Sequence, residues 1–185
     1  GATTVTGTLA EIKAAYAANT AGTISGLGNE AISIIDLSTV VSASDVTDIE
    51  ALTSGAVTVA ISGTTATATS INSLDASSTQ AVNAAGVTAL TGSASDVNSA
   101  YASSGITGLG DEAVTLTDTS AAASILTTVD GNTTGTVDAG TVTALTGTAA
   151  EVNAVYAASG LTGLGNEAVT ISDTTIAVTS LQTLD

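Results

Sequence analysis

The chain has 185 residues, of which Ala, Thr and Ser together make up 92, while Cys, Met, Trp, Phe, Pro and His are absent. The chain has seventeen carboxylates but only one Lys and no Arg, which gives a net charge of −16. This charge argues against binding to a nucleic acid or to an anionic membrane surface. Because the usual general bases, nucleophilic thiols and zinc ligands are missing, the composition predicts a protein that is not an enzyme and has no cofactor.

The apolar content predicts a folded chain with a narrow core. Hydrophobic residues make up 44% of the sequence and aromatic residues only 2%, so the core must consist mainly of small aliphatic side chains. The mean hydropathy of +0.48 is too high for a disordered acidic chain. No apolar run approaches the length of a membrane span, and we expect no membrane insertion.

Four short helices are predicted along the chain by capping boxes, in which a Ser or Thr is followed three residues later by an acid. The boxes are Thr8/Glu11, Ser42/Asp45, Ser93/Asp96 and Thr148/Glu151. Apolar residues follow at helical spacing, as in Ile12, Ala15 and Tyr16. Three further helices of a second type are predicted within 64–75, 119–130 and 174–185, where Ile, Leu and Val recur at similar spacing.

Runs of β-branched residues follow the Gly-rich loops between these helices and predict strands. The runs span residues 31–35, 57–61, 114–117, 142–145 and 169–172. Each unit of the chain therefore contains a strand, a turn, a helix and a loop.

The order of these elements repeats with a period of about 55 residues, which indicates a stacked structural unit. Residues 92–118 match residues 147–173 at 17 of 27 positions, and 7–36 is a looser third copy with about three extra residues after its Tyr. Two unlike half-repeats alternate, which predicts one array of about seven coils of roughly 27 residues. The coils span about 1–36, 37–63, 64–91, 92–118, 119–146, 147–173 and, in part, 174–185.

Stacked coils of this kind predict an α/β fold, a right-handed solenoid with a parallel β-sheet and helices on its other side. An all-β solenoid, in which the helical segments would be irregular corners, is the alternative. The capping boxes favour the α/β version. Both ends of the chain fall inside the repeat pattern, and we therefore expect a segment of a longer array.

The most regular polar feature is Gly-Leu-Gly-(Asn or Asp)-Glu, at 26–30, 108–112 and 163–167, followed six residues after the Glu by an Asp. Their oxygens could bind calcium. The candidate ligands are Asn29, Glu30, Asp36, Asp111, Glu112, Asp118, Asn166, Glu167 and Asp173. In the alternative interpretation the glycines form a turn, Asn or Asp takes a left-handed conformation in it, and the Asp caps the next helix.

Four other recurrent or isolated residues have simpler expected roles. Tyr16, Tyr101 and Tyr156 recur on the apolar stripe of their helices, which predicts packing residues with a hydroxyl near the surface. Lys13 is expected to be a solvated helix residue.

The run VTALTGTAAEVNAVYAASGLTGLGNEAVTISDT resembles the Thr/Ala/Gly-rich tandem repeats of very large secreted or cell-surface proteins of bacteria, especially marine cyanobacteria. The resemblance implies a structural, adhesive or protective surface polymer. The expected function is thus a structural repeat segment of an extracellular surface protein or filament, acting as a stiff spacer, stalk or coat. A calcium-dependent adhesin module is the alternative. The expected partners are adjacent repeats of the same chain or other copies associating end to end.

Overall fold

The computed structural model describes residues 1–35, 43–61, 63–78 and 81–182, and its contacts group the chain into two compact units. The first unit comprises Gly1–Thr64, Ser70–Val87 and Ser103–Gly108. The second comprises Thr65–Thr69, Thr88–Ala102 and Leu109–Asp185.

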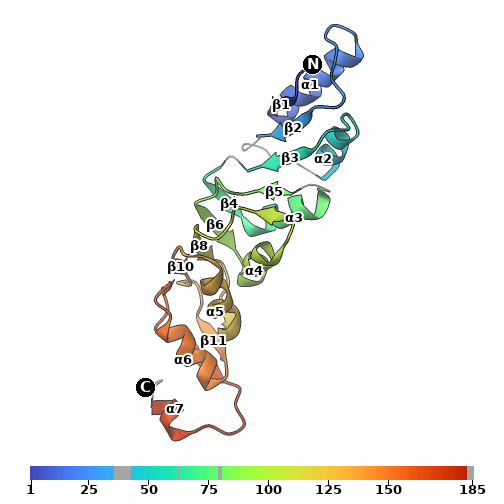
Figure 1. Cartoon of the computed structure of the whole chain (residues 1–185). Coiled ribbons are helices and arrows are strands. Elements are labelled where there is room, and N and C mark those ends of the chain that lie inside the picture. The colour runs from blue at the N-terminus through green and yellow to red at the C-terminus, as the bar shows by residue number, and fades with distance from the viewer. Residues whose placement is uncertain (36–42, 62, 79–80, 183–185) are drawn as a thin grey trace. The chain divides into compact units, whose positions relative to one another are not determined.

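The first unit contains a parallel sheet in which each new strand is added at the same edge (Figure 1). Its strands, in spatial order, are β1 (Thr4–Gly7), β2 (Ala31–Ile34), β3 (Val57–Ala60), β5 (Val82–Asn83) and β7 (Ile106–Thr107). The unit also contains α1 (Leu9–Thr20), α2 (Ala43–Glu50) and most of α3 (Ala68–Ser77).

Alternate residues of the strands build the core of this unit. Ile34, Val59 and Val82 occupy neighbouring positions of the sheet and are at most 2% exposed. Ile12 and Tyr16 of α1 pack into the same cluster. Because parallel strands bury one face against helices, β-branched side chains fill the inward positions and leave the outward positions to Thr and Ser.

The second unit contains two parallel sheets and the remaining helices. The first sheet consists of β4 (Thr65–Thr67), β6 (Ala89–Gly92), β8 (Ala113–Leu116), β10 (Val137–Asp138) and β12 (Leu161–Thr162), in that order. The other sheet consists of β9 (Ser120–Ala122), β11 (Ala144–Gly147) and β13 (Ala168–Ile171). The helices are α4 (Ala94–Ala102), α5 (Ala123–Asn132), α6 (Ala149–Ala157) and α7 (Val178–Gln182).

The strand register of the second unit reveals a spacing that is shorter than the half-repeat expected from the sequence. Ala89 pairs with Ala113, and Ala144 pairs with Ala168, so paired residues lie 24 positions apart. Two spacings of 24 residues are together seven residues shorter than the 55-residue period of the sequence. These seven residues lead from the start of β8 at Ala113 to the start of β9 at Ser120, where the chain changes sheet.

Outward threonines link neighbouring strands through their side chains. The hydroxyls of Thr58 and Thr107 donate to the backbone oxygens of Ile32 and Val82 on the adjacent strand, at 3.1 and 3.3 Å. Thr162 does the same to Val137 at 3.3 Å. A Thr in an outward position therefore adds a hydrogen bond to the sheet as well as a favourable strand propensity.

The structure confirms the α/β class with parallel strands. Helices begin directly after Thr8, Ser93 and Thr148 as predicted, whereas the box residue Ser42 lies outside the described residues. One sheet was expected, but the described residues form three. The expected strand 142–145 is wrong by two residues, because the N–H of Val142 bonds to Ala139 in a turn and β11 begins at Ala144.

Candidate functional site

Three similar turns, each associated with one tyrosine, are the most regular polar structures of the protein. We call them Tyr–Glu turns: 26–30 with Tyr16, 108–112 with Tyr101 and 163–167 with Tyr156. Both glycines of each turn have positive φ, 83 to 89° at the first and 136 to 138° at the second. L-residues rarely adopt these angles, which explains the Gly-x-Gly pattern.

In the first turn the Glu30 carboxylate, on a residue only 1% exposed, accepts hydrogen bonds from its own turn. The N–H of Gly28 lies 2.9 Å from both carboxylate oxygens, and the N–H of Asn29 lies 3.2 Å from Oε2. The hydroxyl of Tyr16 donates to Oε1. The buried charge is thus balanced by several donors, as a buried ionised group requires.

The other two turns repeat this arrangement. The N–H of Gly110 lies 3.0 Å from Oε2 of Glu112, and the Tyr101 hydroxyl also donates to this carboxylate. In the third turn, the N–H of Gly165 and the hydroxyl of Tyr156 lie 2.6 and 2.8 Å from oxygens of Glu167. Glu112 is completely buried, whereas Glu167 is partly exposed.

These contacts shift the pKa values of both partners. Burial raises the pKa of Glu30, but the Tyr16 hydroxyl and the backbone N–H groups outweigh it, so the net pKa is lowered. The pKa of Glu167 is lowered in the same way. Burial and the hydrogen bond to the glutamate raise the pKa of Tyr16 and of Tyr156 to about 12, and the pKa of Tyr101 is raised by the same two causes.

Two of the turns lie beneath a segment that precedes the next strand of the same sheet. We call these the cover segments, 53–57 and 133–137. The hydroxyls of Thr53 and Thr133 donate to the backbone oxygens of Glu30 and Glu112 at 2.7 and 2.8 Å. The cover segments therefore contact the backbone of the buried Glu30 and Glu112, while no described residues contact Glu167 in this way.

Asp36 lies outside the described residues, and the other eight predicted metal ligands separate into three groups. Asn29, Asp111 and Asn166 are exposed, and the three glutamates contact tyrosines. Asp118 and Asp173 each accept a hydrogen bond of 2.7 Å from the first N–H of a helix, at Ala94 and Ala149. Among the described residues, no three Asp or Glu side chains lie close enough together to bind a metal ion. Calcium binding stays a prediction.

Two details of the alternative interpretation are wrong. The Asn and Asp residues of the turns do not have positive φ, because the two glycines provide the whole reversal. Asp118 and Asp173 cap helices that begin 24 residues earlier, since the strand register places each aspartate beside the preceding helix and not the next one.

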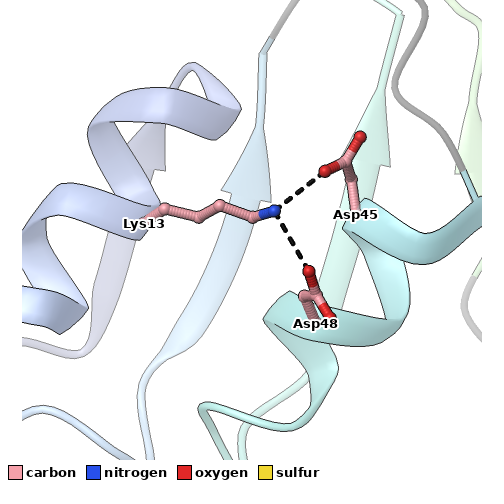
Figure 2. A network of polar contacts seen from close by, with 3 residues as sticks. All are labelled: Lys13, Asp45 and Asp48. Carbon is pink, nitrogen blue, oxygen red and sulfur yellow. Dashed lines mark hydrogen bonds and ion pairs between the residues drawn. The ribbon is translucent and has the colours of Figure 1, made fainter.

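Lys13 forms a polar network within the first unit, where we expected a solvated side chain (Figure 2). Its Nζ lies 2.8 Å from Oδ1 of Asp45 and 3.2 Å from Oδ2 of Asp48, so it connects α1 with α2. Hydrogen bonds to Asp45 and Asp48 raise the pKa of Lys13. All three side chains are exposed to solvent to a degree, and such pairs contribute little to stability.

Tyr16 packs in the core and Tyr156 lies near the surface, both as expected, but our sequence interpretation missed the hydrogen bonds from the tyrosines to the glutamates. Tyr16 is only 3% exposed, and its hydroxyl reaches a buried carboxylate instead of the surface. A signal was available: every tyrosine precedes a Gly-Leu-Gly-(Asn/Asp)-Glu turn, and the step from tyrosine to glutamate is the same in the second and third copies. In the first copy this step is three residues longer, and α1 is correspondingly three residues longer than α4 and α6.

Comparisons with protein families, curated proteins and solved structures find no match to this chain. No described helix combines the length and the apolar character that a membrane crossing needs.

Proposed function

We propose that this chain is a structural repeat segment that serves as a stiff spacer, stalk or coat in an extracellular surface protein or filament. The observation that carries the proposal is the internal use of the repeated polar groups. The tyrosine hydroxyls bond to glutamates, two aspartates bond to helix amides, and threonine hydroxyls bond to adjacent strands. Groups bound in this way stabilise the repeat and do not present reactive atoms to a substrate.

The finer architecture that we propose is a right-handed α/β solenoid of about seven coils. It is supported by the strands of the second unit, which pair in parallel at a regular spacing, and by the three Tyr–Glu turns, which recur in the same place relative to their strands. In such an array each coil contacts its neighbours only, and length is gained by adding coils. A secreted spacer needs this property and needs no catalytic group.

Small-angle X-ray scattering of the full chain tests this architecture. A compact globular chain of 185 residues has a radius of gyration of about 16 Å. The solenoid predicts a clearly larger value and a distance distribution with the long tail of a rod. A value near the globular estimate with a symmetric distribution would contradict the proposal.

A thermal melt followed by circular dichroism distinguishes the spacer from the calcium-dependent adhesin. The melt is recorded in EDTA, in CaCl₂ and in MgCl₂ at matched ionic strength. An inert spacer gives equal melting temperatures in the two divalent salts. A rise specific to calcium would favour an adhesin, with ions at the Tyr–Glu turns.

A further inference from the structure

The chain contains one acceptor motif for N-linked glycosylation, at the junction between α5 and the second cover segment. The motif is an Asn followed two residues later by Ser or Thr, with any residue except Pro between them. The chain has eight Asn residues, and only Asn132, in the run Asn-Thr-Thr at 132–134, meets this condition. Asn132 is the last residue of α5 and is exposed to solvent.

The two threonines of the motif have a role in the fold itself. Their equivalents in the first cover segment are of the same type, namely Thr53 and Ser54 for Thr133 and Thr134. The hydroxyls of all four donate to backbone oxygens of the Tyr–Glu turn beneath their segment. The fold therefore explains why hydroxyl residues stand at these two positions of the motif.

Asn132 is the position of the motif that the fold does not explain. Its equivalent in the first unit is Leu52, the residue before the first cover segment, which is 37% exposed. Because an amide and an aliphatic side chain occupy equivalent exposed places, neither is needed for a cover segment to bind its turn. The Nδ2 of Asn132 lies 3.3 Å from Oδ1 of Asn98 on α4, which is a long hydrogen bond between exposed side chains.

The surroundings of Asn132 leave room for a large substituent. Apart from its chain neighbours and the backbone of α5, no heavy atom of the described residues would lie within 4 Å of a Cβ added to Gly131. A glycan on the exposed amide beside this open position displaces no part of the core. A substituted amide also retains one N–H, so the hydrogen bond to Asn98 is compatible with the modification.

We propose that Asn132 is an acceptor for N-linked glycosylation, with an oligosaccharide carried on a lipid diphosphate as the donor. Nδ2 of Asn132 forms a bond to C1 of the first sugar, and it loses one proton to a base of the transferase. The bond between C1 and the diphosphate oxygen breaks, and the lipid diphosphate leaves with the electron pair. The inference rests on the proposed extracellular location, because a chain meets this type of transferase during export.

The contacts of the motif indicate that transfer precedes the folding of the second cover segment. Thr133 is only 9% exposed, and its hydroxyl lies 2.8 Å from the backbone oxygen of Glu112. The backbone N–H of Thr134 donates to Gly110 at 2.8 Å. A transferase must reach both the Asn amide and the second Thr hydroxyl, and the folded segment holds the motif against its turn.

Export of the full chain through a eukaryotic secretory pathway tests the site. The chain carries a cleavable signal and a removable terminal tag with its own acceptor motif, and intact mass is measured before and after the tag is cleaved. We expect one N-glycan on the cleaved chain. Asn132→Gln and Thr134→Val should carry none, whereas Thr134→Ser retains the hydroxyl and should retain the glycan. A glycosylated tag on a chain that is unmodified at Asn132 would overturn the proposal.

A purified oligosaccharyltransferase with its lipid-linked oligosaccharide tests the order of events. A peptide of residues 127–138 and the folded full chain are compared as acceptors, and the peptide should react at least about tenfold faster because its motif is open. Equal rates would overturn the inferred order. The glycosylation and the spacer fail separately, because a rod-like scattering profile without a glycan overturns only the former and a glycan on a compact chain overturns only the latter.

Discussion

The three tyrosines each donate a hydroxyl to a glutamate of a Gly-x-Gly turn. In the first and second pairs the carboxylate is buried and needs hydrogen-bond donors, and the tyrosine hydroxyl supplies one. The turn brings the backbone N–H of its second glycine to the same carboxylate. The Tyr–Glu turn of the repeat thus holds an ionised carboxylate inside a small core.

A spectrophotometric pH titration of the tyrosines tests this interpretation. The pKa values of Tyr16 and Tyr156 are raised to about 12 and that of Tyr101 is raised too, against about 10 for an unfolded chain. Because the folded pKa is higher, the stability that these pairs contribute is complete below pH 10 and is lost as the pH rises through 12. We therefore expect delayed tyrosinate absorbance together with alkaline unfolding.

The chain unfolded in urea is the control, and there the tyrosines should ionise near the ordinary pKa. Since the protein has three tyrosines and no tryptophan, the absorbance reports only on the Tyr–Glu turns. Ionisation near pH 10 with no loss of structure would show that the hydroxyls are not held by the glutamates.

Glu112→Gln and Glu167→Gln form a matched pair of substitutions. Glu112 is 0% exposed beneath its cover segment, and the new amide group would place N–H donors against Tyr101 and Gly110. We expect Glu112→Gln to lower the free energy of unfolding by about 1–3 kcal/mol, and Glu167→Gln by clearly less. Urea denaturation measures the free energy of unfolding of both variants. Equal losses would mean that the burial of the glutamate does not set the cost of the substitution.

Helices and strands in this protein depend on contacts from elements distant in the sequence. The first N–H of α4 is capped by Asp118 and that of α6 by Asp173, each on a segment 24 residues later. Among the described elements, four strands have only two residues each, namely β5, β7, β10 and β12. Such strands exist because their neighbours pair with them, and no local pattern of alternation can predict them.

Asp118→Ala should therefore destabilise the protein by removing the cap of α4, a helix to which Asp118 does not belong. We expect the free energy of unfolding to fall by about 1 kcal/mol, as for the loss of other N-terminal caps. Asp111→Ala removes the same charge from an exposed turn position and should change stability by less than about 0.5 kcal/mol. Urea melts of the two variants decide the matter, and an equal effect would mean that charge alone is responsible.

The whole molecule carries seventeen acidic side chains and one basic side chain. The network of Lys13, Asp45 and Asp48 offsets only a small part of this charge. Repulsion among the remaining carboxylates opposes the compact state. The internal hydrogen bonds of the repeat must therefore act against an unfavourable electrostatic background.

Sodium chloride should accordingly stabilise the protein. Between about 0.01 M and 0.15 M salt the Debye length falls from about 30 Å to about 8 Å, which screens repulsion between exposed carboxylates. We expect the melting temperature to rise over this range, and the Lys13→Gln variant to show a similar rise. A falling melting temperature would instead mean that attractive pairs dominate the surface.

Particular residues show how far the sequence could predict the structure. Thr8, Ser93 and Thr148 marked their helices correctly because a capping box is a local interaction over three residues. The Tyr–Glu pairs were missed because their partners lie 11 or 14 residues apart and meet only across a turn. The caps by Asp118 and Asp173 were assigned to the wrong helix, since their partners depend on strand register.

The sequence by itself determined the α/β class, the places of most helices, the turn glycines and the acidic, small-residue composition of this protein. These features follow from local conformational preferences and from composition. Only the tertiary structure decided the strand register, the division into three sheets, the burial of Glu30 and Glu112, and the covering of their turns by distant segments. Those features depend on which strands lie side by side, and hydrogen bonds between parallel strands join residues that are far apart in the chain.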